Sequence, residues 1–151
     1  MTTPLKTLAF IASWLVASPF VHAQNLTLDD ITKAGIDYMV TEYALDQVQY
    51  SACGLTLAKK MSPANFDKTK REFLSVFNDE ARKKLDLYFH GTEMRGLKDA
   101  VSNQGILEPI NKAKAQGKNM DAYCDREVDK LIRLNEQTRR NWFAVKAKIP
   151  G

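Results

Sequence analysis

The stretch 119–145, NMDAYCDREVDKLIRLNEQTRRNWFAV, decides the fold class of this chain. Apolar or small side chains recur in it every three or four residues, as they do on one face of an α-helix. We therefore predict a long amphipathic helix that follows an N-cap at Asn119 and turns this face toward a core. The inward positions are expected to be Cys124, Val128, Leu131, Leu134, Thr138, Trp142 and Val145.

Two earlier stretches show the same periodicity. The first covers residues 28–55, and Gly54 is expected to end or kink its helix. The second is expected to start at Ser62-Pro63, because serine caps free N–H groups and proline suits the first helical position, and to end before Gly91. Its inward face is predicted to consist of Phe66, Phe73, Phe77, Ala81, Leu85 and Tyr88.

Shorter helices are expected between these long ones. Residues 92–103 have helical spacing and are expected to stop at Gly105, and Pro109 is expected to open another short helix or turn. The polar, glycine-containing residues 115–119 are predicted to form a loop. No segment has the alternation typical of a strand. We predict an all-α protein, a small bundle of about four helices in a single domain spanning residues 24–151.

The N-terminus has the pattern of a cleavable signal peptide. Lys6 precedes an apolar run at 8–17, Ser18-Pro19 interrupts it, and Val21-His22-Ala23 offers the side chains that a signal peptidase accepts. A transmembrane anchor is disfavoured, because the run is well short of the roughly 20 apolar residues that span a bilayer. We expect cleavage after Ala23 and a periplasmic or secreted protein, with the periplasm preferred.

Two cysteines, Cys53 and Cys124, remain after this cleavage. An even number of cysteines in an exported chain predicts a disulfide, here one that joins the first long helix to the start of the last. An intermolecular bridge or a pair of redox thiols stays open as the alternative. No C-x-x-C spacing supports a redox role.

Residues typical of catalysis or cofactor binding are few. His90 is the one histidine beyond the predicted signal peptide. Because it lies at a predicted helix end, where an imidazolium interacts well with the terminal carbonyl groups, we expect its role to be structural. No cofactor is therefore predicted. The alternative is a small exported enzyme or a haem or metal carrier that uses His90 or a pair of carboxylates. For a haem carrier, the candidate axial ligands besides His90 are Met39, Met94 and Met120. For an enzyme, the candidate acids or bases are Asp79, Glu80, Asp125, Glu127 and Asp129.

The remaining hypothesis is binding through a surface. Leu87, Phe89 and Phe143 lie off the predicted inward faces, where large apolar side chains are candidate binding anchors. His90, Glu93 and Arg95 are candidate rim residues around them. A second core layer would also explain the three apolar residues.

Charge narrows the choice of partner. Beyond residue 23 there are 21 basic and 18 acidic side chains, an excess too small to indicate nucleic acid. The basic and aromatic tail at 139–148 suggests an anionic partner or a membrane surface, although Trp142 is simply expected to be buried. We expect a small exported, non-enzymatic protein that binds another envelope protein or an exported toxin, such as an inhibitor, an immunity protein or an accessory factor.

Overall fold

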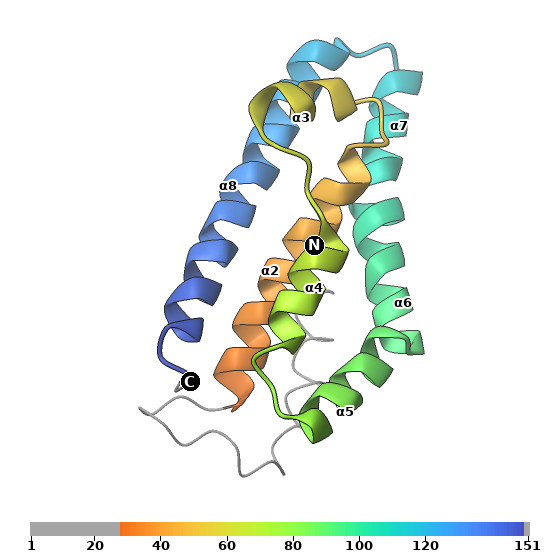
Figure 1. Ribbon diagram of the computed structural model, residues 1–151. Coiled ribbons are helices and arrows are strands. Elements are labelled where there is room, and N and C mark those ends of the chain that lie inside the picture. Colours follow the sequence, from red (N-terminus) through yellow and green to blue (C-terminus); the bar gives the residue numbers. More distant parts are fainter. Residues whose placement is uncertain (1–27, 150–151) are drawn as a thin grey trace.

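The structure, a computed structural model, describes residues 28–149 without the side chains of Leu28, Tyr88, Glu93, Leu97, Ala100 and Ser102. The predicted signal peptide lies outside this range. Within the range the chain is helical and has no strand, which confirms the all-α prediction (Figure 1). It contains more helices than the four or so expected. The elements are α2 (Leu28–Val48), α3 (Gly54–Lys60), α4 (Phe66–Leu74), α5 (Asp79–Phe89), α6 (Thr92–Asp99), the π-helical η2 (Ala100–Leu107), α7 (Glu108–Ala115) and α8 (Met120–Lys146).

Helices α2 and α8 lie side by side in opposite directions and form the main axis of the bundle (Figure 1). Asn119 caps α8 as predicted, because its side-chain oxygen accepts a hydrogen bond from the backbone N–H of Ala122 at 3.2 Å. Cys124, Val128 and Trp142 are buried on the predicted face. The long C-terminal stretch therefore folds as its periodicity indicates.

The prediction that Leu134 points inward is wrong. This side chain is 49% exposed, whereas the adjacent Asn135 is only 5% exposed. The Asn135 amide nitrogen donates to Thr41 Oγ1 at 3.0 Å and to Glu42 Oε1 at 3.3 Å, both on α2. Because consecutive residues lie about 100° apart around a helix, orienting Asn135 toward α2 leaves Leu134 at the edge of the interface.

The first predicted helix is interrupted earlier than expected. Helix α2 ends at Val48, a turn follows, and α3 begins at Gly54. A Cβ at position 54 would lie 2.3 Å from the carbonyl oxygen of Gln49, so the tight turn requires glycine there. Leu55, at the end of the predicted stretch, is exposed because the break gives α3 a new direction.

The second predicted helix is two helices. It begins three residues after Pro63, where Asn65 accepts a hydrogen bond from the N–H of Lys68 at 2.9 Å. A break at residues 75–78 separates α4 from α5, and Asn78 caps α5 through the N–H of Ala81 at 2.9 Å. The predicted inward residues Phe66, Phe73, Phe77, Ala81 and Leu85 are nevertheless all buried.

Gly105 does not stop a helix, contrary to the prediction. The chain stays helical from α6 through η2 into α7, with π-type bonds such as the Glu108 N–H to the Asn103 oxygen. The predicted loop follows α7. Gly117 has φ of 69°, and the N–H groups of Gly117 and Lys118 donate to the oxygens of Lys114 and Ala113, which makes a Schellman helix end.

Buried side chains form two clusters. One surrounds Phe73 and Trp142 between α2, α4, α5 and α8. The other surrounds the Cys53–Cys124 disulfide, whose Cα atoms are 5.2 Å apart and which confirms the predicted pairing. The bond joins the start of α3 to the first turns of α8 at one end of the bundle (Figure 1).

Candidate functional site

The predicted surface residues divide into exposed and buried ones. Leu87 on α5 is 74% exposed and Phe143 on α8 is 43% exposed. Phe89 is only 4% exposed, so its assignment to a binding surface is wrong. Its ring packs edge-on against Phe73, with centroids 6.1 Å apart, because α5 buries a wider stripe than its periodicity indicated.

His90 and Arg95 are exposed near the junction of α5 and α6, and the side chain of Glu93 is outside the described set. Nδ1 of His90 lies 2.8 Å from the carbonyl oxygen of Asp86, one turn earlier in α5. The main neighbours of α5 are α4 and α6, whereas α8 packs on α2, α3 and α7. Direct helix packing therefore does not bring Leu87 and Phe143 together.

The candidate carboxylates are engaged in ion pairs with lysine or arginine. Asp79 contacts Arg82 at 3.2 Å and Glu80 contacts Lys84 at 2.9 Å. Lys60 bridges the other two aspartates, Asp125 at 2.5 Å and Asp129 at 2.7 Å. Glu127 contacts both Arg126 and Lys130. The pairs of Asp79, Glu80 and Lys130 join neighbouring turns of one helix, whereas Lys60 joins α3 to α8.

The side of α8 that faces away from the core carries positive charge. Arg126, Lys130, Arg133, Gln137 and Arg140 follow one another at three- and four-residue steps, and all five are exposed. We call these residues, together with Leu134 beside them, the α8 outer face. A shallow open depression on it is lined by Arg126, Asp129, Lys130, Arg133, Leu134 and Gln137.

Charge is concentrated in the C-terminal part of the chain. Residues 130–148 contain six basic side chains and one acidic side chain, a net charge of +5, whereas the whole chain carries +4. Among the described residues neither Arg133 nor Arg140 forms an ion pair.

Partial burial alone would raise the pKa of Glu127, but hydrogen bonds from Arg126 and Lys130 lower it.

The basic and aromatic tail divides between core and surface. Trp142 is buried, as predicted, and its ring centroid lies 5.4 Å from the ring centroid of Phe73. Phe143 is at the surface, with the Arg139 guanidinium 5.6 Å and the Lys146 ammonium 5.8 Å from its ring centroid. The tail thus continues the basic surface of α8 without removing Trp142 from the core.

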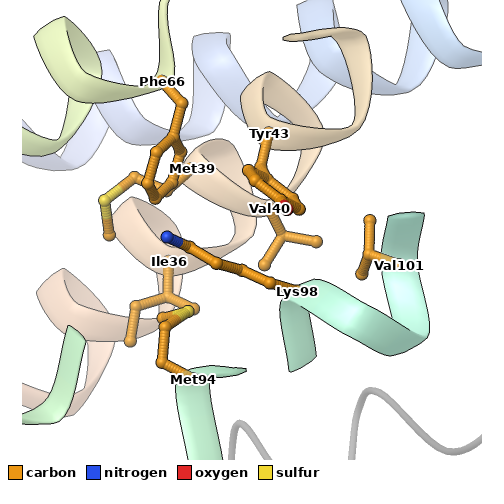
Figure 2. A pocket seen from close by; sticks show the side chains of 8 residues that line it. All are labelled: Ile36, Met39, Val40, Tyr43, Phe66, Met94, Lys98 and Val101. Carbon is orange, nitrogen blue, oxygen red and sulfur yellow. The ribbon is translucent and has the colours of Figure 1, made fainter. Parts of the chain in front are cut away.

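A second candidate site lies between α2, α4 and α6, where the side chain of Lys98 enters an apolar pocket (Figure 2). Its ammonium is 4.7 Å from the ring centroid of Phe66 and 5.3 Å from that of Tyr43. Burial lowers the pKa of Lys98, the nearby Lys70 lowers it further, and Asp67 opposes both effects. The pocket is lined by Ile36, Met39, Val40, Tyr43, Phe66, Met94, Lys98 and Val101.

The described side chains do not group three or more histidines, cysteines or carboxylates where a metal ion could be held. Two of the three methionines proposed as haem ligands, Met39 and Met94, are buried in the pocket of Lys98, whereas His90 is at the surface. No described helix combines the length and the apolar character needed to cross a membrane.

The helical spacing of the sequence could not predict the α8 outer face or the pocket of Lys98. Leu134 fits the inward spacing of α8 as well as Asn135 does, so only the contact with α2 distinguishes them. Lys98 lies in a helix but contacts residues about 30 to 60 positions away. Comparison of the chain with protein-family models, curated proteins and solved structures found no match.

Proposed function

We propose that this chain is an exported, non-enzymatic binding protein and that the α8 outer face is its surface for an acidic protein partner. The observation that carries the proposal is an exposed leucine, Leu134, set among Arg126, Lys130 and Arg133 on one side of a single helix. Protein interfaces combine an apolar centre with a polar rim and are enriched in arginine relative to the rest of the surface. The partner is another envelope protein or an exported toxin.

Export is supported by two features. Residues 1–23 have the charge, apolar run and cleavage pattern of a signal peptide, so we infer a mature chain that starts at Gln24. The Cys53–Cys124 disulfide is typical of proteins in an oxidising compartment such as the periplasm. An inhibitor, an immunity protein or an envelope accessory factor fits both features.

The positive charge of α8 indicates how such a partner is recognised. A cluster of like charges steers an oppositely charged protein toward its surface and raises the association rate, an effect that salt weakens. Arg133 and Arg140 lack ion-pair partners among the described residues, so their guanidinium groups are available to carboxylates of a partner. We therefore expect the partner to carry an acidic patch around a small apolar depression.

The test places a photo-crosslinking residue at position 134 and exposes the protein to envelope extract. Each crosslinked partner is then purified and its dissociation constant measured with wild type, Arg133→Glu and Arg71→Glu. Arg71 is an exposed arginine on α4, so its reversal makes the same change of charge elsewhere. We expect at least about tenfold weaker binding for Arg133→Glu, a loss that shrinks at high salt, and little change for Arg71→Glu.

Three results would contradict the proposal. Equal losses for both variants would show that only net charge matters. Unchanged binding by Arg133→Glu would exclude the outer face. Binding to anionic phospholipid vesicles without any crosslinked protein would replace a protein partner with a membrane surface.

A further inference from the structure

Lys98 places a positive charge where the described structure offers no ion-pair partner. Its ammonium contacts the faces of Phe66 and Tyr43, and no described carboxylate lies within ion-pair distance of it. Ring faces compensate a cation only partly for lost water. A positively charged group held this way attracts an anion more strongly than a lysine in full contact with solvent.

A second lysine, Lys70, lies outside the lining of this pocket but acts on the charge of Lys98. Lys70 on α4 is mostly buried, its ammonium lies 5.5 Å from the Phe89 ring centroid, and its charge disfavours the charged form of Lys98. Asp86 is 3.9 Å from Lys70 and offsets part of that charge. An anion beside the Lys98 ammonium would offset this repulsion, so the position of Lys98 favours a negatively charged ligand.

The pocket beneath Lys98 is apolar and adaptable. A cavity of about 10 Å³ remains in it, room for about one water molecule, because the methylene groups of Lys98 occupy the rest. Met39 and Met94 line it with flexible thioether side chains that adjust to irregular shapes. If the flexible Lys98 stem turns outward, the same volume accepts a hydrocarbon chain.

We propose that this pocket binds a carboxylate amphiphile of the fatty-acid type. The carboxylate pairs with the ammonium group of Lys98, and the first part of the hydrocarbon chain replaces the Lys98 methylenes beside Met39 and Met94. The π-helical η2 begins two residues after Lys98, and π-helical turns are frequent at functional sites. This site is separate from the α8 outer face, so either can fail without the other.

The experiment titrates the full exported chain with decanoate and with decanol, both below the concentration at which they form micelles. Calorimetry gives the dissociation constants, and thermal unfolding gives the change in Tm. Decanoate is expected to bind about tenfold more tightly than decanol and to raise Tm, because only decanoate places a negative charge beside Lys98.

Two lysine-to-methionine variants sharpen the test. Lys98→Met removes the charge and keeps an apolar stem of similar length, so the variant is expected to fold and to bind decanoate at least about tenfold more weakly. Lys112→Met, at an exposed position of α7, is the control and should bind as wild type does. A direct sign of occupancy is a shift of the Met39 and Met94 methyl signals in NMR spectra on addition of decanoate.

The inference is overturned if decanoate neither binds nor raises Tm. It is also overturned if decanol binds as well as decanoate, since the charge of Lys98 would then play no part, or if Lys98→Met binds as well as wild type. Methyl shifts elsewhere with unchanged Met39 and Met94 signals would place the ligand outside this pocket.

Discussion

Replacing Gly35 with alanine is expected to destabilise the protein, against the usual effect of this change in a helix. Gly35 lies within α2, where Phe73 and Trp142 pack directly against its backbone. A Cβ at this position would lie 2.2 Å from both Cδ2 and Cε2 of Phe73 and 3.2 Å from Cζ3 of Trp142. The added methyl group therefore meets two aromatic rings at distances that require a neighbour to move.

The magnitude follows from two opposing effects. Alanine is favoured over glycine in a helix by about 1 kcal/mol. Overpacking a well-packed core typically costs about 1–3 kcal/mol and occasionally more. Phe73 is held by Phe77, Phe89 and Trp142, with ring centroids 4.9 to 6.1 Å away, so its ring has little room to retreat. Because Phe73 cannot retreat, the overpacking cost is expected in the upper part of this range, about 2–3 kcal/mol, which leaves a net loss of about 1–2 kcal/mol, or a Tm lower by roughly 3–10 °C.

Thermal and urea unfolding followed by circular dichroism measures this loss. Gly96→Ala is the matched control, because a Cβ at that position of α6 has no other atom within 4 Å and should leave stability equal or higher. Phe73→Leu combined with Gly35→Ala should cost less than the two single changes added together. A rise in Tm for Gly35→Ala similar to that of Gly96→Ala would refute the packing of Phe73 on this glycine.

Two further changes test the bonds that hold α8 to the rest of the molecule. Replacing Cys53 and Cys124 together with alanine is expected to lower the free energy of unfolding by roughly 4 kcal/mol, since the disulfide closes a loop of 71 residues; an unchanged urea midpoint would contradict this. Asn135→Ala removes a donor from the buried Glu42 carboxylate and is expected to cost about 1–3 kcal/mol. The exposed Asn141→Ala is its control, and equal urea midpoints for the two variants would show that the Asn135 hydrogen bonds contribute nothing.

Local signals in the sequence predicted much of the fold. The spacing of Cys124, Val128 and Trp142 predicted one buried face of α8, and the cap at Asn119 predicted where the helix begins. These predictions hold because a helical period and a capping side chain act within a few residues. The Cys53–Cys124 pairing was predictable for another reason, since two cysteines allow a single intramolecular bond.

Breaks within a helical pattern were harder to predict. Residues 75–78 have no proline or glycine, and their apolar side chains fit a continuous helix. The structure ends α4 there because Asn78 caps α5 and Arg82 donates to the oxygens of Leu74 and Phe77. Such side-chain hydrogen bonds compete with helix formation, and the spacing of apolar residues does not show where they prevail.

The sequence by itself determined the helical class, the main buried faces and the disulfide, because periodicity, caps and cysteine count are local or combinatorial properties. Tertiary structure alone decided which of two adjacent residues is buried where both fit the helical spacing. Asn135 is buried in place of Leu134 because its amide bonds to Thr41 and Glu42 across the α2–α8 interface. Lys98 lies in an apolar pocket because the folded chain brings Phe66 and Tyr43 to it. Both outcomes depend on contacts between residues far apart in the chain, which no local pattern records.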